Sequence, residues 1–290
     1  MRHAPFPDRS CMRIACRELG FSLIETIAVI AITAVIGAVV SIFVRGPVMG
    51  YVDTARRAEL TDQADTALRR MARDIRLAVP NSVRVDPTGL AVEFLLTSGG
   101  GRYRAGCINA ATGNPLIFGD ASAYPCEPVD NGSFEVLGPP VTVAATDSIV
   151  IFNLGIPGAD AYAGDTRRGV NGTSGAVNTI AYSGGAFPFT SPANRFQIVQ
   201  TPVSYVCNIA ARTLTRYWGY APTAGQVVPP VGAGLASALV ARDVSACAFT
   251  YDAFVVTQRE GLVTMRLQLQ RAGDTDAVTL YHEVHVNNVP

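Results

Sequence analysis

The feature that most constrains this chain is an unbroken apolar run from Phe21 to Val44, 24 residues in which Glu25 is the one charged side chain. As a helix the run would be about 36 Å long, enough to cross a hydrocarbon layer of about 30 Å. It is longer than the apolar core of an ordinary secretory signal, and no small-x-small cleavage site follows it. We therefore expect residues 21–44 to form a transmembrane helix that stays in the mature protein.

The charges on either side of this run predict its orientation. Four arginines precede it, whereas the three arginines between residues 45 and 59 are interspersed with Asp53 and Glu59. Positive charge is retained on the cytoplasmic side of a membrane helix. The asymmetry favours a cytoplasmic N-terminus, with the bulk of the chain on the other side of the membrane.

Glu25 is an unusual residue for a membrane anchor, because a carboxylate within an apolar span is costly and is a functional candidate by default. If the chain began at Phe21, a free amine would lie within one helical turn of Glu25, or within its reach on a neighbouring chain. Such a pair would compensate the buried charge, and a negative charge is also favoured near a helix N-terminus. The alternative is a glutamate in the headgroup region of a plain anchor.

The residues around this point form a compact motif: Arg17-Glu18-Leu19-Gly20, then Phe21-Ser22-Leu23-Ile24-Glu25, then the apolar run. The motif resembles the processing signal of type IV prepilins and type II secretion pseudopilins. The resemblance implies that prepilin peptidase removes residues 1–20 by cutting between Gly20 and Phe21, and that Phe21 is N-methylated. It also implies that Glu25 contacts the N-terminal amine of an adjacent subunit in a filament.

Beyond the anchor, residues 45–79 are expected to form the amphipathic half of a helical spine. Gly46-Pro47 is predicted to interrupt the helix, bending or melting it locally, because proline removes a backbone hydrogen bond. Further on, apolar residues recur at steps of three and four, and Pro80 disfavours helix in the residue before it. This apolar stripe consists of Leu60, Ala64, Ala67, Met71, Ile75 and Ala78.

Residues 80–290 are expected to form a globular, β-rich head, which gives an α+β fold: a long N-terminal helix packed on an antiparallel sheet. The clearest strand is 262–269, where apolar and polar residues alternate. Long loops are expected between the strands, at 97–147, 154–194 and 219–240. Segments rich in β-branched and aromatic residues predict strands at 91–96, 148–153, 196–207, 214–217, 246–254, 262–269 and 278–286.

The six cysteines divide at the apolar run. Cys11 and Cys16 precede it, and four lie beyond it, where an oxidising compartment would allow two disulfides in three possible connectivities. The sequential pairing, Cys107 with Cys126 and Cys207 with Cys247, is the hypothesis we favour. Buried free thiols are the alternative.

The last third of the chain extends the resemblance. Residues 201–207, 214–220 and 244–249 are similar to segments of the biogenesis minor pilins of mannose-sensitive haemagglutinin pili. This likeness implies a head of the pseudopilin J kind and a disulfide between Cys207 and Cys247.

The sequence offers no catalytic residues, cofactor motif or metal site. Gly99-Gly100-Gly101 is followed by Arg102 and not by a phosphate-binding lysine. His282 and His285 are three residues apart on an expected strand and so point to opposite faces, and Asp120, Asp160 and Asp165 match no calcium-loop spacing. The 23 acidic residues balance the 23 basic ones, which argues against nucleic acid as the primary ligand.

These observations predict a minor pilin or pseudopilin, not an enzyme, anchored in a bacterial inner membrane with a periplasmic head. The resemblance implies as partners other pilin subunits, prepilin peptidase, the inner-membrane assembly platform and membrane lipid, and a pilus or pseudopilus as the assembled form. A pseudopilin J-like subunit of a type II secretion system is one alternative. An anchored periplasmic β-domain that binds a ligand and never assembles is the other.

Overall fold

The computed structural model describes residues 21–119, 121–126, 130–255 and 260–290. Gly20 and the rest of the expected leader, including Cys11 and Cys16, lie outside the described residues, as does Asp120. The chain divides into two compact units, residues 1–55 and 56–290. Each unit is described by itself below.

The helix α1 (Leu23–Arg76) begins in the first unit and ends in the second. It is the regular structure of the described part of the first unit and the first element of the second unit. It continues through Pro47, so the prediction that Gly46-Pro47 interrupts the helix is wrong. Proline removes only one backbone donor, and the hydrogen bonds of the neighbouring turns can carry the helical path past it. The helix ends three residues before the predicted stop at Val79.

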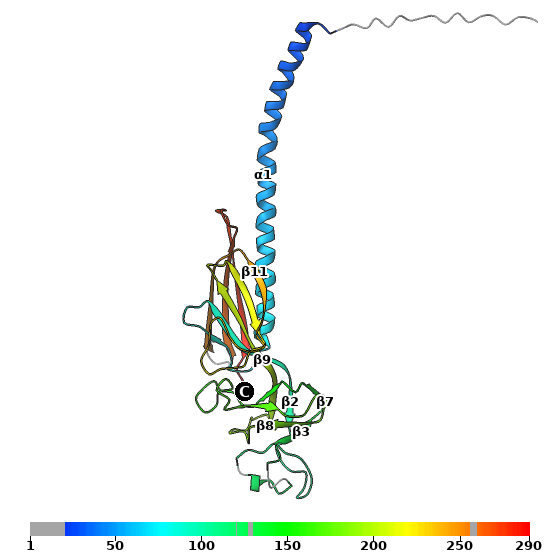
Figure 1. Cartoon of the computed structure of the whole chain (residues 1–290), viewed down its shortest axis with the longest axis vertical. Helices are drawn as coiled ribbons and strands as arrows, with labels where there is room; N and C mark the ends of the chain where they lie inside the picture. Colours follow the sequence, from blue (N-terminus) through cyan, green and yellow to red (C-terminus); the bar gives the residue numbers. More distant parts are fainter. Residues whose placement is uncertain (1–20, 120, 127–129, 256–259) are drawn as a thin grey trace, which may run out of the picture. The chain divides into compact units, whose positions relative to one another are not determined.

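From Arg56 onward α1 packs on the head with the face that the sequence predicts (Figure 1). Its apolar residues at steps of three and four face the core because they share one side of the helix. The buried residues of this part of α1 are Leu60, Ala64, Ala67, Leu68, Met71, Ala72 and Ile75.

The described residues of the head form three antiparallel sheets, which together with α1 confirm the α+β fold class. A short 3-10 helix spans Ala121–Ala123. The two-stranded sheet pairs β4 (Val141–Val143) with β7 (Gly175–Val177), and the three-stranded sheet contains β12 (Val244–Val255), β13 (Glu260–Gln270) and β14 (Ala277–Asn287). The largest sheet has the order β1 (Arg84–Val85), β2 (Ala91–Tyr103), β3 (Ser133–Leu137), β8 (Thr179–Ser183), β6 (Arg167–Val170), β5 (Ser148–Val150), β9 (Arg195–Asn208), β10 (Thr213–Trp218) and β11 (Ala236–Arg242).

Two long strands, β2 and β9, connect two structural layers of the head. They pair with each other along most of their length, so the strands β2-β3-β8-β6-β5-β9 close into a ring. This ring is a small barrel, drawn in green in the lower part of Figure 1. Its interior holds an apolar core of its own, which includes Tyr103, Phe134 and Phe196.

The other ends of β2 and β9, with β1, β10 and β11, form a sheet that shares a second core with α1 and the three-stranded sheet. In that core β13 buries Val263, Met265, Leu267 and Leu269, as its alternation predicts. The helix is therefore covered by two sheets, and burial of its apolar stripe supplies much of the stability of this layer.

The regions expected to be long loops contain much of the barrel, and that expectation is wrong. Strand β2 continues to Tyr103, and β3, β4, β6, β7, β8 and the start of β11 lie within the three predicted loops. Apart from β2 and β11, these strands are only three to five residues long, so they carry little local signal. Their register partners lie far along the chain, and distant pairing is what stabilises them.

Candidate functional site

The N-terminus of α1 is a well-capped helix end at the start of the described chain. The Glu25 amide donates a hydrogen bond to Ser22 Oγ at 3.3 Å, and the Thr26 amide donates to the Ser22 carbonyl at 3.1 Å. Ser22 is thus the N-cap, and the spacing Ser22-x-x-Glu25 is that of a capping box. The helix is established two residues after Phe21, so a chain that began at Phe21 would keep it.

Glu25 lies in the first turn of this helix and its side chain is exposed. A carboxylate at this position interacts favourably with the partial positive charge of the helix N-terminus. Phe21 is 78% exposed and is only four residues away. An N-terminal amine at Phe21 and the Glu25 carboxylate would therefore both be open to a neighbouring chain.

The apolar part of α1 is exposed along its whole length. Every residue from Phe21 to Glu59 is exposed, including the whole run of isoleucines and valines. Among the described residues this is the one helix long and apolar enough to cross a membrane. So large an apolar surface is not stable in water and marks a contact with lipid or with other chains.

A polar cluster fixes the last turn of α1 to the head. Asp74 accepts a hydrogen bond from Tyr205 Oη at 2.7 Å. It also forms an ion pair with Arg216, whose Nε lies 2.8 Å from its carboxylate. Arg216 lies over the ring of Trp218, 5.0 Å from its centroid. Burial, and then the negative charge of Asp74, raises the pKa of Tyr205, so this phenol stays protonated and remains a donor.

A second polar cluster is buried between β1, β2 and the segment after β10. Glu93, 3% exposed at its side chain, accepts from Arg84 at 2.9 Å and from Tyr220 Oη at 3.0 Å. Tyr220 also shares a hydrogen bond of 2.6 Å with Ser204, and Arg84 lies over the Tyr162 ring at 3.7 Å. Burial, followed by the charge of Glu93, raises the pKa values of both tyrosines. Glu93 and the two tyrosines are buried and hydrogen-bonded or packed within the cluster, as is typical of a cluster that stabilises a fold.

The remaining candidates for chemistry are explained by local structure. His282 is half-buried opposite Met265, whereas His285 is exposed on the other face of β14 and lies 3.5 Å from Glu260. Within the described residues no group of three His, Cys, Asp or Glu side chains could hold a metal ion.

The two loop aspartates stabilise their own turn. Asp160 Oδ1 accepts from the Tyr162 amide at 2.8 Å, and Asp165 Oδ2 accepts from the Asp160 amide at 3.2 Å. In the glycine run of β2, a Cβ on Gly100 would lie 2.6 Å from the Phe196 carbonyl oxygen. Glycine is required there because the two strands approach closely.

The structure contains disulfides Cys107–Cys126 and Cys207–Cys247, the sequential pairing among the three possibilities. The second bond links β9 to β12, and so joins the two sheets that cover α1. It closes a loop with a sequence separation of 40 residues.

We expect the double substitution Cys207→Ala/Cys247→Ala to lower the free energy of unfolding by about 2–4 kcal/mol, because the bond restricts the unfolded chain. Chemical denaturation of the full chain in detergent, followed by near-ultraviolet circular dichroism, measures this change. The pair Cys11→Ala/Cys16→Ala, in the same unprocessed chain that retains residues 1–20, is the control and is expected to leave the midpoint unchanged. Equal midpoints for the two double variants would contradict the role of the inter-sheet bond.

The sequence analysis missed both polar clusters and a pair of arginines on the barrel, Arg102 and Arg195. Their members are far apart in the chain and meet only through strand register, as Glu93 with Ser204 and Arg102 with Arg195. A buried charge within a predicted strand, such as Glu93 in 91–96, was the one local signal available.

Comparisons with protein-family models, with curated proteins and with solved structures give no match to this chain. The architecture is therefore assigned from the geometry of the chain alone. That geometry is type IV pilin-like: one long N-terminal helix, apolar and exposed in its first part and packed in its second part on antiparallel β-sheets.

Proposed function

We propose that this chain is a minor pilin or pseudopilin, which assembles into, or primes, a type IV pilus filament after prepilin peptidase has removed its leader. The observation that carries the proposal is the exposed apolar helix that begins immediately after Gly20-Phe21 and has Glu25 in its first turn. Lipid covers this surface before assembly, and the helices of other subunits cover it afterwards. The chain's activity is assembly and not catalysis.

The charge of Glu25 favours transfer of this helix from the membrane into a filament. A carboxylate in an apolar environment needs a partner. The amine of a processed Phe21 on a neighbouring subunit is such a partner, and the pair forms only between chains that have been cut. The cut thus converts a membrane anchor into an element that polymerises.

The head then determines the position of the subunit and its choice of neighbours. Within the pilins we assign the chain to the MshO kind, the biogenesis minor pilins of mannose-sensitive haemagglutinin pili. Residues 201–207, 214–220 and 244–249 and the Cys207–Cys247 bond support this assignment. In this role the chain lies in the inner membrane, with its head in the periplasm and an assembly platform as its partner.

Mass spectrometry of the mature N-terminus tests the proposal. Isolated from a cell with active prepilin peptidase, the chain is expected to begin at Phe21 and to carry one added methyl group on its amine. The same chain from a cell without that peptidase is the control, and it should retain residues 1–20.

An intact Met1 in the presence of the peptidase would contradict the proposal and favour an anchored β-domain that never assembles. The choice between a pilus and a type II secretion pseudopilus has a separate readout. Deletion of the chain is expected to reduce the number of surface pili and to leave protein secretion unchanged. Loss of secretion with normal piliation would assign it to the pseudopilin J alternative.

A further inference from the structure

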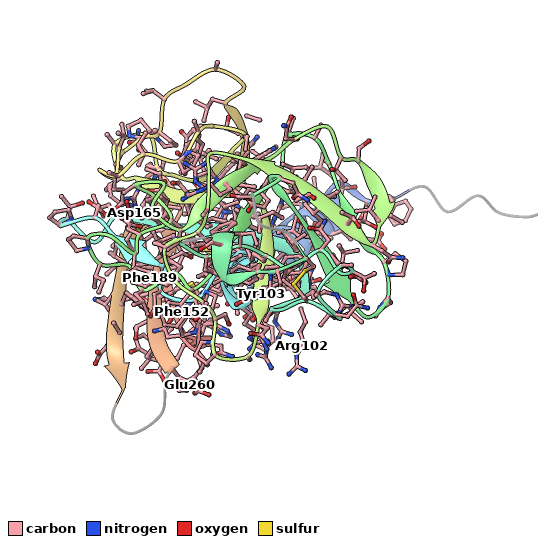
Figure 2. All side chains as sticks on the ribbon, turned by 90° about the horizontal axis from the view of Figure 1, so that it is seen from below. Arg102, Tyr103, Phe152, Asp165, Phe189 and Glu260 are labelled. Atoms are coloured by element: carbon pink, nitrogen blue, oxygen red, sulfur yellow. A yellow bond between two sulfur atoms is a disulfide. The ribbon has the colours of Figure 1, made fainter. Side chains whose placement is uncertain are left out.

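The outer surface of the barrel carries two arginines directly opposite each other. The register of β2 and β9 pairs Arg102 with Arg195, so both side chains leave the sheet on the same face. Both are exposed, and neither makes an ion pair or a side-chain hydrogen bond with the residues that the structure describes. Figure 2 shows Arg102 reaching outward beside Tyr103, which is buried in the barrel core.

This arrangement conflicts with the stability of the strand pair. Like charges directly opposite on an antiparallel pair repel each other. The other arginines of the barrel have acceptors: Arg104 pairs with Glu135 at 2.5 Å, Arg167 donates to the Ala161 carbonyl and Arg168 donates to the Gly185 carbonyl. A local conflict of this kind, beside arginines that have acceptors, is a mark of a functional surface.

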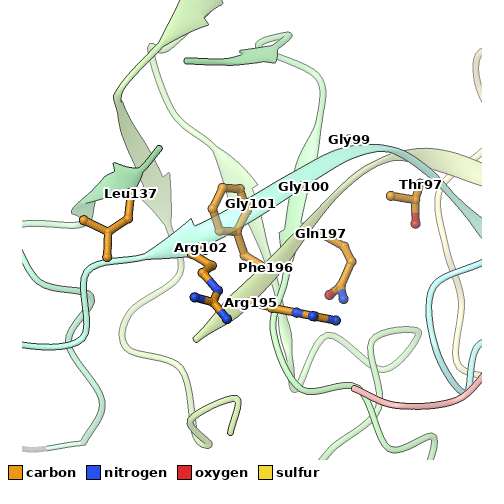
Figure 3. A pocket seen from close by; sticks show the side chains of 9 residues that line it. All are labelled: Thr97, Gly99, Gly100, Gly101, Arg102, Leu137, Arg195, Phe196 and Gln197. Atoms are coloured by element: carbon orange, nitrogen blue, oxygen red, sulfur yellow. The ribbon is translucent and has the colours of Figure 1, made fainter. Parts of the chain in front are cut away.

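The two arginines lie in a shallow trough of about 470 Å³ that follows β2 and β9, with Leu137 of β3 at one end (Figure 3). Gln197 leaves β9 on the same side as Arg195 and adds an amide that can donate or accept hydrogen bonds. Phe196 is 1% exposed, and its ring lies on the opposite side of the strands, in the barrel core. The trough therefore offers no aromatic face on which a sugar ring could stack.

The backbone beside the arginines is incompletely paired. Arg102 pairs with Leu137 on one side and Arg195 on the other, whereas residues 99–101 pair with β9 alone among the described strands. Outward N–H and C=O groups of a strand can accept an added extended segment. An acidic side chain on such a segment would lie within reach of the arginine pair.

We propose that this trough binds an extended, acidic peptide segment of a partner protein, with Arg102 and Arg195 clamping a side-chain carboxylate. Guanidinium groups present a planar pair of donors that matches a carboxylate, and the bonds are strengthened by charge. The carboxylate would also remove the repulsion between the arginines, so ligand binding and relief of the conflict reinforce each other. This site is independent of α1 and of filament assembly.

Fluorescence anisotropy with two short labelled peptides tests the site on the full chain in detergent micelles. One peptide alternates Glu with Thr, and the other alternates Gln with Thr. The wild-type chain is expected to prefer the Glu peptide. The double variant Arg102→Gln/Arg195→Gln is expected to bind it about tenfold or more weakly, through loss of charge-assisted hydrogen bonds.

The double variant Arg242→Gln/Arg266→Gln is the matched control, since both residues are exposed and the change in net charge is the same. It is expected to keep the wild-type affinity. Equal affinity in the Arg102/Arg195 variant, or equal binding of the two peptides, would overturn the proposal. So would binding of an acidic uronate oligosaccharide by a chain that does not bind the Glu peptide.

Thermal unfolding separates binding from folding. Removal of two facing positive charges should leave the midpoint of the Arg102→Gln/Arg195→Gln variant at or above that of the wild type. A lower midpoint would mean that the arginines stabilise the barrel through contacts of their own, and would overturn their assignment as a ligand clamp.

Discussion

A chain with Glu25→Gln is expected to insert into the inner membrane as the wild type does and to be lost from sheared filaments. Glutamine keeps the size of the side chain and a hydrogen-bond acceptor but removes the charge. In the assembled filament it would leave the amine of Phe21 on a neighbouring subunit buried without a counter-charge. An uncompensated buried charge costs about 3–5 kcal/mol, so incorporation should fall by about a hundredfold or more.

Immunoblots of the membrane and sheared-filament fractions measure insertion and incorporation separately. Glu283→Gln, the same chemical change at an exposed position of β14, is the control and is expected to be incorporated normally. Undiminished incorporation of Glu25→Gln would refute the charge-pair mechanism. Because the peptide-binding assay on the barrel needs no filament, its result stands whatever this experiment finds.

The second large effect is expected at Glu93, in the core of the head. Glu93→Ala removes a carboxylate that accepts from both Arg84 and Tyr220, and it leaves the mostly buried guanidinium group of Arg84 with carbonyl acceptors but without a counter-charge. Loss of one member of a buried ion pair costs about 3–5 kcal/mol, because the remaining charge stays desolvated. The free energy of unfolding of the full chain should fall by that amount in chemical denaturation.

Asp276→Ala provides the comparison, since it breaks the ion pair between Asp276 and Arg57. Their side chains are 42% and 63% exposed, respectively. Exposed pairs contribute about 0–1 kcal/mol, so this variant should unfold almost as the wild type does. Similar losses in the two variants would show that enclosure of the Glu93 cluster does not determine its contribution to stability.

The parts of the fold that were predictable share one property: their signal lies within a single element. The stripe from Leu60 to Ile75 repeats at the period of a helix, and Val263 to Leu269 alternates at the period of a strand. Burial followed both patterns, because the side chains of one element that share a face must find the same core.

The errors have the opposite property. The expectation that Pro47 interrupts the helix was wrong because the loss of one backbone hydrogen bond is small within a helix of 54 residues. The loops expected at 97–147 and 154–194 followed from a high content of Gly, Ala, Pro, Ser and Asn, although β3, β6 and β8 are held by partners elsewhere in the chain. No local pattern shows that β2 and β9 pair and so close the barrel.

The sequence by itself determined the exposed apolar helix, the motif around Gly20 and Phe21, the single charge at Glu25 and the choice of residues for the spine and the central strands. These follow from hydrophobic period and charge, which are properties of neighbouring residues. Only the tertiary structure decided that Asp74 meets Arg216, that Glu93 meets Tyr220, and that Arg102 lies opposite Arg195. Such contacts depend on strand register across long loops, because a shift of one residue would move every side chain to the other face of its sheet.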